Sequence, residues 1–467
     1  AHADWYRAET ENFIIHADAT EEVVTEYARH LERFDAVLRH FTGTDPEPAE
    51  IGHQIDPKLD VGRLQRRMGG GGTIGGIYIP DMRGPYAAAP IYGYQTVLHE
   101  YVHHFMLHHA PAAYPRWYRE GFAEFFSTVS FDDEDHADLG RFPFGRADDL
   151  VYSRRFSFED LLREDENTNH FALYVQGWIL VHHSVFHQRT GRLLAEYLQL
   201  MNRGQTGEQA FQATFASLGD ELDDMLKDYG RGRMPMSRTT RTFEVSGEIA
   251  IRKLSEEEAT VEALYPRRRD YLEREMLSAV RNYPRNAQVH AELAQLRLAQ
   301  DRLDEALAAA DAALAIDPDH VEANVFKGTA LLRRADASGD PADSRWAEAR
   351  ELFLRANRAD PYYPLALLRY YQSFPDRNAR PDNAIAALEQ AYFFVPQNRE
   401  TRLQLAYELL RAGRFEEARL LALPMIYWPH ATDTLTAGAQ AIIEDARRSD
   451  AAIEIEDWHL TEFIDEE

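Results

Sequence analysis

Apolar residues recur at helical spacing along much of the first half of this chain. In the segment 95–109 they lie three and four positions apart, which buries one side of an α-helix. These residues are Leu98, Tyr101, Val102, Phe105 and Met106. Prolines bound the segment on both sides, so we expect a single helix between them. The segments 20–41, 170–187 and 206–229 are also predicted to be helical.

Two short strands and a linker complete the pattern of this half. The strands are predicted at 12–16 and at 74–79, and the second follows a run of glycines and ends at a proline. No strand and helix flank these glycines in the order that a dinucleotide site needs. Residues 231–254 begin with a stretch rich in Arg, Gly, Ser and Pro, so we expect a linker there, after a domain at 1–230.

Residues 255–467 follow a different pattern, in which an alanine and a proline recur at a fixed offset on alanine-rich segments. The pairs are Ala306 with Pro318, Ala349 with Pro361, and Ala384 with Pro396, and Ala418 continues the register. A small residue lets paired helices approach, and the proline closes the second helix. The pattern resembles tetratricopeptide (TPR) repeats. That resemblance implies an all-α solenoid with a surface for peptides or protein partners.

The predicted helix at 95–109 carries the candidate chemistry. His99 and His103 lie four residues apart and therefore share one helical face, with Glu100 beside them. A hydrolytic zinc ion needs three protein ligands and an open position for water. Glu120 is the candidate third ligand of one zinc per chain, and Glu100 is the candidate general base. Glu124 is placed to accept a hydrogen bond from the far nitrogen of a ligand histidine.

The HExxH motif and the following Trp-x-x-Glu-Gly-x-Ala-Glu segment at 117–124 resemble the gluzincin metallopeptidases. The likeness is strongest to the bacterial peptidase MA-like proteins, many of them exported, and covers roughly the first half of the chain. It implies an α+β zincin-like catalytic domain with Glu120 as third zinc ligand. The gap from His103 to Glu120 is shorter than in the aminopeptidase and thermolysin branches. If the loop 110–116 cannot turn tightly, Glu124 becomes the ligand instead.

The same resemblance implies two further parts of a catalytic site. A Tyr-x-x-x-Trp helix suggests Tyr174 as the donor to an oxyanion. The alternatives are His182, His183 and His187. The strand at 74–79 would be the edge strand that pairs with an extended substrate, and the alternative is a hairpin loop. Its substrate-contacting residues would be Gly75, Gly76, Ile77 and Tyr78.

Composition narrows the classes of partner and ligand. The formal net charge is −27, which argues against binding to nucleic acid because phosphates would be repelled. The chain has no cysteine, so only histidine and carboxylate ligands are available to zinc. No apolar run is long enough to span a membrane. The sequence begins Ala1-His2-Ala3, as after removal of a signal peptide, so we expect a periplasmic or secreted protein. A cytoplasmic location remains an alternative.

Three functions follow from these observations. The leading hypothesis is a zinc metallopeptidase that hydrolyses peptide bonds by a zinc-activated water, with Glu100 as general base and the repeats binding a substrate or partner protein. The second is a TPR scaffold that binds proteins and has a structural or degenerate zinc site. The third is a zinc hydrolase of a non-peptide amide or ester.

Overall fold

The computed structural model describes most of the chain and divides it into two compact units. The described residues are 4–44, 59–63, 77–89, 94–109, 112–143, 157–163, 170–219, 221–245, 247–264, 269–376, 379–427 and 433–447. The first unit draws on 1–30, 50–93 and 247–401, and the second on 31–49, 94–246 and 402–467. Each unit therefore combines segments from both halves of the sequence. The predicted domain boundaries at 230 and 255 stay a prediction.

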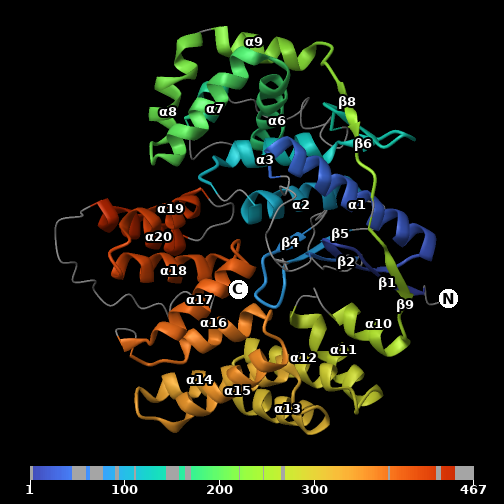
Figure 1. The fold of residues 1–467 in the computed structure, drawn as a ribbon, viewed down its shortest axis with the longest axis vertical. Coiled ribbons are helices and arrows are strands. Elements are labelled where there is room, and N and C mark those ends of the chain that lie inside the picture. Colours follow the sequence, from blue (N-terminus) through green and yellow to red (C-terminus); the bar gives the residue numbers. More distant parts are fainter. Residues whose placement is uncertain are drawn as a thin grey trace. The chain divides into compact units, whose positions relative to one another are not determined.

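The first unit contains a six-stranded mixed sheet with the order β4-β5-β3-β2-β1-β9 (Figure 1). Its strands are β1 (Trp5–Glu9), β2 (Phe13–Asp18), β3 (Leu59–Arg63), β4 (Ile77–Ile79), β5 (Tyr86–Ala89) and β9 (Ala250–Lys253). The pairs β2–β3 and β3–β5 are parallel, and the other pairs are antiparallel. The predicted strand at 12–16 is confirmed as β2. The predicted strand at 74–79 is confirmed for Ile77–Ile79, at the edge of the described sheet.

The same unit contains an array of helical hairpins (Figure 1). Its helices are α10 (Glu256–Leu264), α11 (Arg269–Asn282), α12 (Ala287–Ala299), α13 (Leu303–Ile316), α14 (Val321–Ser338), α15 (Ser344–Ala359), α16 (Pro364–Gln372) and α17 (Asp382–Phe394). The pairs α12/α13, α14/α15 and α16/α17 pack as consecutive hairpins. Ala306, Ala349 and Ala384 are fully buried, as expected for small residues that let two helices approach. The prediction of helical repeats is confirmed.

The second unit contains the remaining helices and a small antiparallel sheet. Its helices are α1 (Glu21–Thr42) from Leu31 on, α2 (Tyr94–His109), α3 (Arg116–Ser127), α5 (Phe158–Leu162), α6 (His170–Phe186), α7 (Gln188–Asn202), α8 (Gly207–Ala213), the 3₁₀ helix η2 (Phe215–Leu218), α9 (Glu221–Arg231), α18 (Arg399–Arg411) from Arg402 on, α19 (Phe415–Ile426) and α20 (Asp433–Arg447). The sheet has the order β6-β7-β8. Its strands are β6 (Ser130–Phe131), β7 (His136–Leu139) and β8 (Ser237–Thr242). The predicted helices at 95–109, 170–187 and 206–229 are confirmed as α2, α6 and α8 to α9.

The segment 231–254, which the sequence predicts to be a linker, contains the strands β8 and β9. Strand β8 pairs with β7, and strand β9 pairs with β1. Most side chains of both strands are exposed. The polar side chains of these two strands therefore resemble those of a linker, although the backbone of each strand is hydrogen-bonded to a neighbouring strand. None of the helices in the described part of the chain is long and apolar enough to span a membrane.

Candidate metal centre

Helix α2 turns two histidines toward a common point. His99 and His103 lie one helical turn apart, and their Nε2 atoms are 3.1 Å from each other. The opposite side of the helix anchors it in the second unit, where Tyr101 donates a buried hydrogen bond of 2.6 Å to Asp35. The buried residue Phe105 adds apolar contact area on that side. The apolar pattern that predicts the helix therefore also fixes the orientation of the histidine face.

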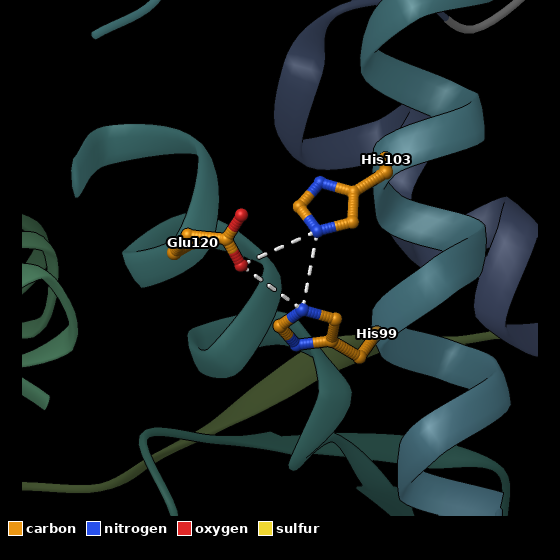
Figure 2. A group of neighbouring side chains, drawn as sticks. All are labelled: His99, His103 and Glu120. Atoms are coloured by element: carbon orange, nitrogen blue, oxygen red, sulfur yellow. Dashed lines mark hydrogen bonds and ion pairs between the residues drawn. The ribbon is translucent and has the colours of Figure 1, made fainter. Parts of the chain in front are cut away.

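Helix α3 brings Glu120 to the same point. Its Oε2 atom lies 3.3 Å from Nε2 of His99 and 3.5 Å from Nε2 of His103 (Figure 2). The helix begins directly after Pro115, whose fixed φ suits the residue that precedes a first helical turn. The position of α3 thus brings Glu120 within reach of both histidines.

The spacing of these three atoms fits a tetrahedral zinc site. Zinc binds histidine nitrogen and carboxylate oxygen at about 2.0–2.2 Å, so two ligand atoms of a tetrahedron lie about 3.3 Å apart. The observed separations are 3.1, 3.3 and 3.5 Å. His99, His103 and Glu120 form the one such group found among the described residues. The side chains therefore already have the arrangement that a shared metal ion requires.

The electrostatics of the group also fit a cation. Oε2 of Glu120 is buried, and Nε2 of His99 and Nε2 of His103 lie 3.3 and 3.5 Å from it. Burial raises the pKa of Glu120, but the charges and hydrogen bonds of His103 and His99 outweigh it and hold the pKa well below its usual value. Burial lowers the pKa of His99, but Glu120, Glu124 and Glu100 outweigh it and raise the pKa to about 8. A positive charge at this point, from a proton on His99 or from a divalent cation, stabilises the buried carboxylates.

Glu124 lies on the far side of His99 from this point. Its Oε1 atom is 3.4 Å from Nδ1 of His99, and its side chain is only 4% exposed. A proton on Nδ1 faces this carboxylate, which leaves Nε2 of His99 with a lone pair for a metal. Glu120 faces both Nε2 atoms, whereas Glu124 faces Nδ1. The geometry therefore favours Glu120 over Glu124 as the ligand.

The other two predicted catalytic residues lie beside the group. The Tyr174 ring on α6 stacks on the His99 ring at a centroid distance of 5.8 Å and an interplanar angle of 23°. Glu100 is half-buried, and its charge contributes to the raised pKa of His99. The structure thus places Tyr174 and Glu100 close to the group, and their roles remain predictions.

The alternative histidines of α6 have other environments. Nδ1 of His182 lies 2.8 Å from the Tyr229 hydroxyl, and Nε2 lies 3.1 Å from the carbonyl of Gly140. The rings of His183 and His187 stack at 4.0 Å. Burial, together with the neighbouring His187 and His182, lowers the pKa of His183 to about 4. His182 and His183 are buried, and none of the three histidines belongs to the metal group.

The predicted substrate strand is partly described. Ile77 and Tyr78 lie in β4, which pairs on one side with β5. Gly75 and Gly76 lie outside the described residues. Strand β4 belongs to the first unit and the metal group to the second. The substrate-binding role of this strand stays a prediction.

Two glycines that the sequence analysis did not single out as structural set the distance between α3 and α6. A Cβ atom on Gly121 would lie 2.3 Å from the carbonyl carbon of Gly177, and a Cβ atom on Gly177 would lie 2.3 Å from the carbonyl oxygen of Trp117. Real Cβ atoms do not approach backbone this closely. Only glycine at both positions allows α3 to lie against α6, which brings Glu120 and Tyr174 close to His99.

We expect Gly121→Ala to lower the free energy of unfolding by about 3 kcal/mol, because the clash is with backbone and the two helices must separate. Urea unfolding followed by circular dichroism measures this change. Gly247→Ala is the matched control, since nothing lies within 4 Å of a Cβ atom there. Equal stability of the two variants would show that α3 and α6 can shift without cost.

Comparison with known proteins finds solved structures of TPR proteins that are similar to part of this chain. No protein-family model matches the chain, and no curated protein matches it. Among solved structures, TTC0263, a thermophilic TPR protein from Thermus thermophilus, matches with 20% identity over 40% of this chain and 96% of its own, at a TM-score of 0.34. MamA matches with 15% identity over 39% of this chain and 88% of its own, at a TM-score of 0.26. YrrB, a TPR protein with an unusual peptide-binding site, matches with 18% identity over 38% and 92%, at a TM-score of 0.27.

These matches cover only about two fifths of the chain at low TM-scores. The chain is therefore similar to TPR proteins in part, and its helical repeats are established by its own hairpins. The resemblance of the first half to gluzincins stays a prediction.

Proposed function

We propose that this protein is a zinc-dependent metallopeptidase with a gluzincin-like, α+β zincin-type catalytic region. The observation that carries the proposal is the convergence of Nε2 of His99, Nε2 of His103 and Oε2 of Glu120 at separations of 3.1–3.5 Å. Three protein ligands of this kind leave the fourth position of a tetrahedral zinc for water. The residues that a hydrolytic mechanism needs beside them, Glu100 and Tyr174, lie on α2 and α6.

Each residue has a defined task in this proposal. A bound zinc ion would supply Lewis acidity, which lowers the pKa of water and polarises a carbonyl group. Glu100 accepts a proton from the attacking water and passes it to the leaving amine. Tyr174 donates a hydrogen bond to the developing oxyanion. Glu124 keeps the proton of His99 on Nδ1, so that Nε2 stays available to the metal.

The test combines metal content with cleavage of a fluorogenic peptide library. We expect about one zinc per chain by elemental analysis, and peptide cleavage that stops on chelation and returns with zinc. A chain that stays metal-free after zinc is supplied would overturn the zinc proposal. Zinc binding with cleavage of simple esters or non-peptide amides alone would replace the peptidase with a hydrolase of that class.

A protein-binding scaffold with a structural zinc site is the second candidate. The observation that favours it is the array of helical hairpins in the first unit, because repeats of this kind expose extended surfaces to peptides and proteins. The two functions separate experimentally. One zinc per chain without cleavage of any library peptide would favour the scaffold.

We expect Tyr174→Phe to lower kcat about 100-fold with zinc still bound, because only the hydroxyl that would contact the oxyanion is lost. The ring stacked on His99 is retained in this variant. Steady-state kinetics on the best library peptide, with zinc analysis of the same sample, measure the effect. Tyr229→Phe is the matched control, because its hydroxyl contacts His182 and not the metal group. Unchanged kcat would remove Tyr174 from the role of oxyanion donor.

A further inference from the structure

The connection between β4 and β5 is a tight turn with an arginine at its tip. The Gly84 amide donates a hydrogen bond of 3.1 Å to the carbonyl of Asp81, and the Arg83 amide donates one of 2.9 Å to Oδ1 of Asp81. Gly84 has φ = +144°, a conformation that glycine adopts without strain. The turn belongs to the first unit, as do the helices α12 to α17. Figure 1 shows it extending from the sheet to these helices.

The array encloses the Arg83 side chain in an acidic pocket. Its Nε donates to Glu322 at 2.6 Å, and its two terminal nitrogens donate to Glu292 at 2.5 and 3.2 Å. One of them also donates to Gln295 at 2.5 Å, and the guanidinium carbon lies 5.6 Å from the centre of the Phe326 ring. Only 8% of the Arg83 side chain is exposed. This fork of donors on paired carboxylates, over an aromatic face, is specific to guanidinium.

The array holds its own carboxylates in place for this ligand. Gln288 donates hydrogen bonds to both Glu292 and Glu322, and the Tyr363 hydroxyl donates to Glu322 at 3.0 Å. Burial raises the pKa of Glu322, but the Arg83 guanidinium and these hydrogen bonds outweigh it and lower the pKa. Two carboxylates held together in this way repel each other unless a cation lies between them. The pocket is therefore built for a positively charged ligand.

The backbone of the turn is bound by the same face. The Leu365 amide donates to the carbonyl of Met82 at 3.1 Å, and the Asn398 side-chain amide donates to the carbonyl of Pro80 at 3.2 Å. The Thr401 hydroxyl lies 3.3 Å from the Met82 sulfur. The contacts thus come from α12, α14 and α16, the first helices of three successive hairpins, and from the start of α18. We call this surface the first-helix face.

We propose that the first-helix face is a receptor for an arginine at the tip of a tight turn, and that residues 81–84 of this chain are its resident ligand. A protein partner with such a turn binds by displacing the resident one. The pocket charge and the paired acceptors exclude acidic or purely apolar ligands, because either would leave Glu292 and Glu322 buried without a counter-charge. The proposal is independent of hydrolysis, since binding is measured without turnover.

The test uses the full chain and a cyclised, fluorescein-labelled peptide that copies residues 79–86. Cyclisation holds the turn and limits the entropic cost of binding. We expect Arg83→Ala to bind the peptide at least about tenfold more tightly than the wild type, because the resident arginine no longer competes. Arg302→Ala is the matched control, since it removes the same charge from an exposed site in the array and should bind like the wild type. Fluorescence anisotropy measures all three.

Specificity and folding are checked in the same series. A peptide with alanine in place of the arginine should not bind, and Glu322→Gln in the Arg83→Ala background should weaken binding of the arginine peptide. Equal binding by wild type and Arg83→Ala, no binding by either, or equal binding of the two peptides would overturn the proposal. If Arg83→Ala does not fold, the test is instead the hydrogen-exchange rate of residues 80–86 in the wild type, measured with and without the peptide. The peptide should accelerate that exchange, and an unchanged rate would overturn the proposal.

Discussion

Replacing Glu100 with glutamine should lower the turnover number by about 100-fold to 10,000-fold while one zinc per chain is retained. Glutamine has the size of glutamate but no basic oxygen, so it cannot accept the proton of the attacking water. Glu100 is half-buried beside His99 and is not one of the three residues whose ligand atoms converge. The variant therefore separates loss of the base from loss of the metal.

The measurement is kcat on the best library peptide, with zinc analysis of the same preparation. Glu196→Gln is the matched control, because Glu196 is exposed on α7 and the substitution is identical. Near-normal turnover of Glu100→Gln would exclude Glu100 as the base. Loss of zinc would instead give Glu100 a part in holding the metal group together.

The local parts of the candidate site could be predicted from the sequence because helix geometry alone determines them. Two histidines four residues apart share a face of any α-helix, and the Nε2 atoms of His99 and His103 do lie 3.1 Å apart. The position of Glu120 depends on the loop after α2, whose length left Glu124 as an alternative. In the structure, α3 begins directly after Pro115 and turns Glu120 toward both Nε2 atoms.

The non-local parts could not be predicted in this way. The approach of Gly121 to Gly177 joins segments about 56 positions apart, and a glycine in a helix gives no sign of which helix it meets. Strands β8 and β9 lie where most side chains are exposed, so no apolar alternation marks them. Likewise, nothing in the turn sequence around Arg83 indicates carboxylates more than 200 residues away.

The helical repeats could be predicted because each hairpin repeats one local rule. Ala306, Ala349 and Ala384 are fully buried in successive hairpins. Which segment binds to the surface of the helical repeats could not be predicted. The repeat pattern predicts an external peptide or protein there, whereas the first-helix face binds a turn of the same chain through Met82 and Arg83. Any partner at that face therefore has to compete with an internal ligand.

Replacing Glu120 with alanine should weaken zinc binding about 100-fold to 1,000-fold. The binding free energy of a structural zinc ion is roughly 10–16 kcal/mol over four protein ligands, or about 3 kcal/mol for each ligand. Oε2 of Glu120 is buried and faces both Nε2 atoms. Glu124→Ala should cost less, about 10-fold to 100-fold, because it removes only the carboxylate that orients His99. Competition with a zinc-binding dye measures both affinities.

The order of these two effects identifies the ligand. Both variants lose one negative charge from a buried carboxylate on α3, so the difference between them reports position and not charge. Glu196→Ala on the exposed face of α7 should leave zinc affinity unchanged, and circular dichroism checks that each variant is folded. If Glu124→Ala were the weaker binder, Glu124 would be the ligand and Glu120 the orienting residue. In the structure, Oε2 of Glu120 lies 3.3 and 3.5 Å from the two Nε2 atoms, whereas Oε1 of Glu124 lies 3.4 Å from Nδ1 of His99, so we expect the larger loss from Glu120→Ala.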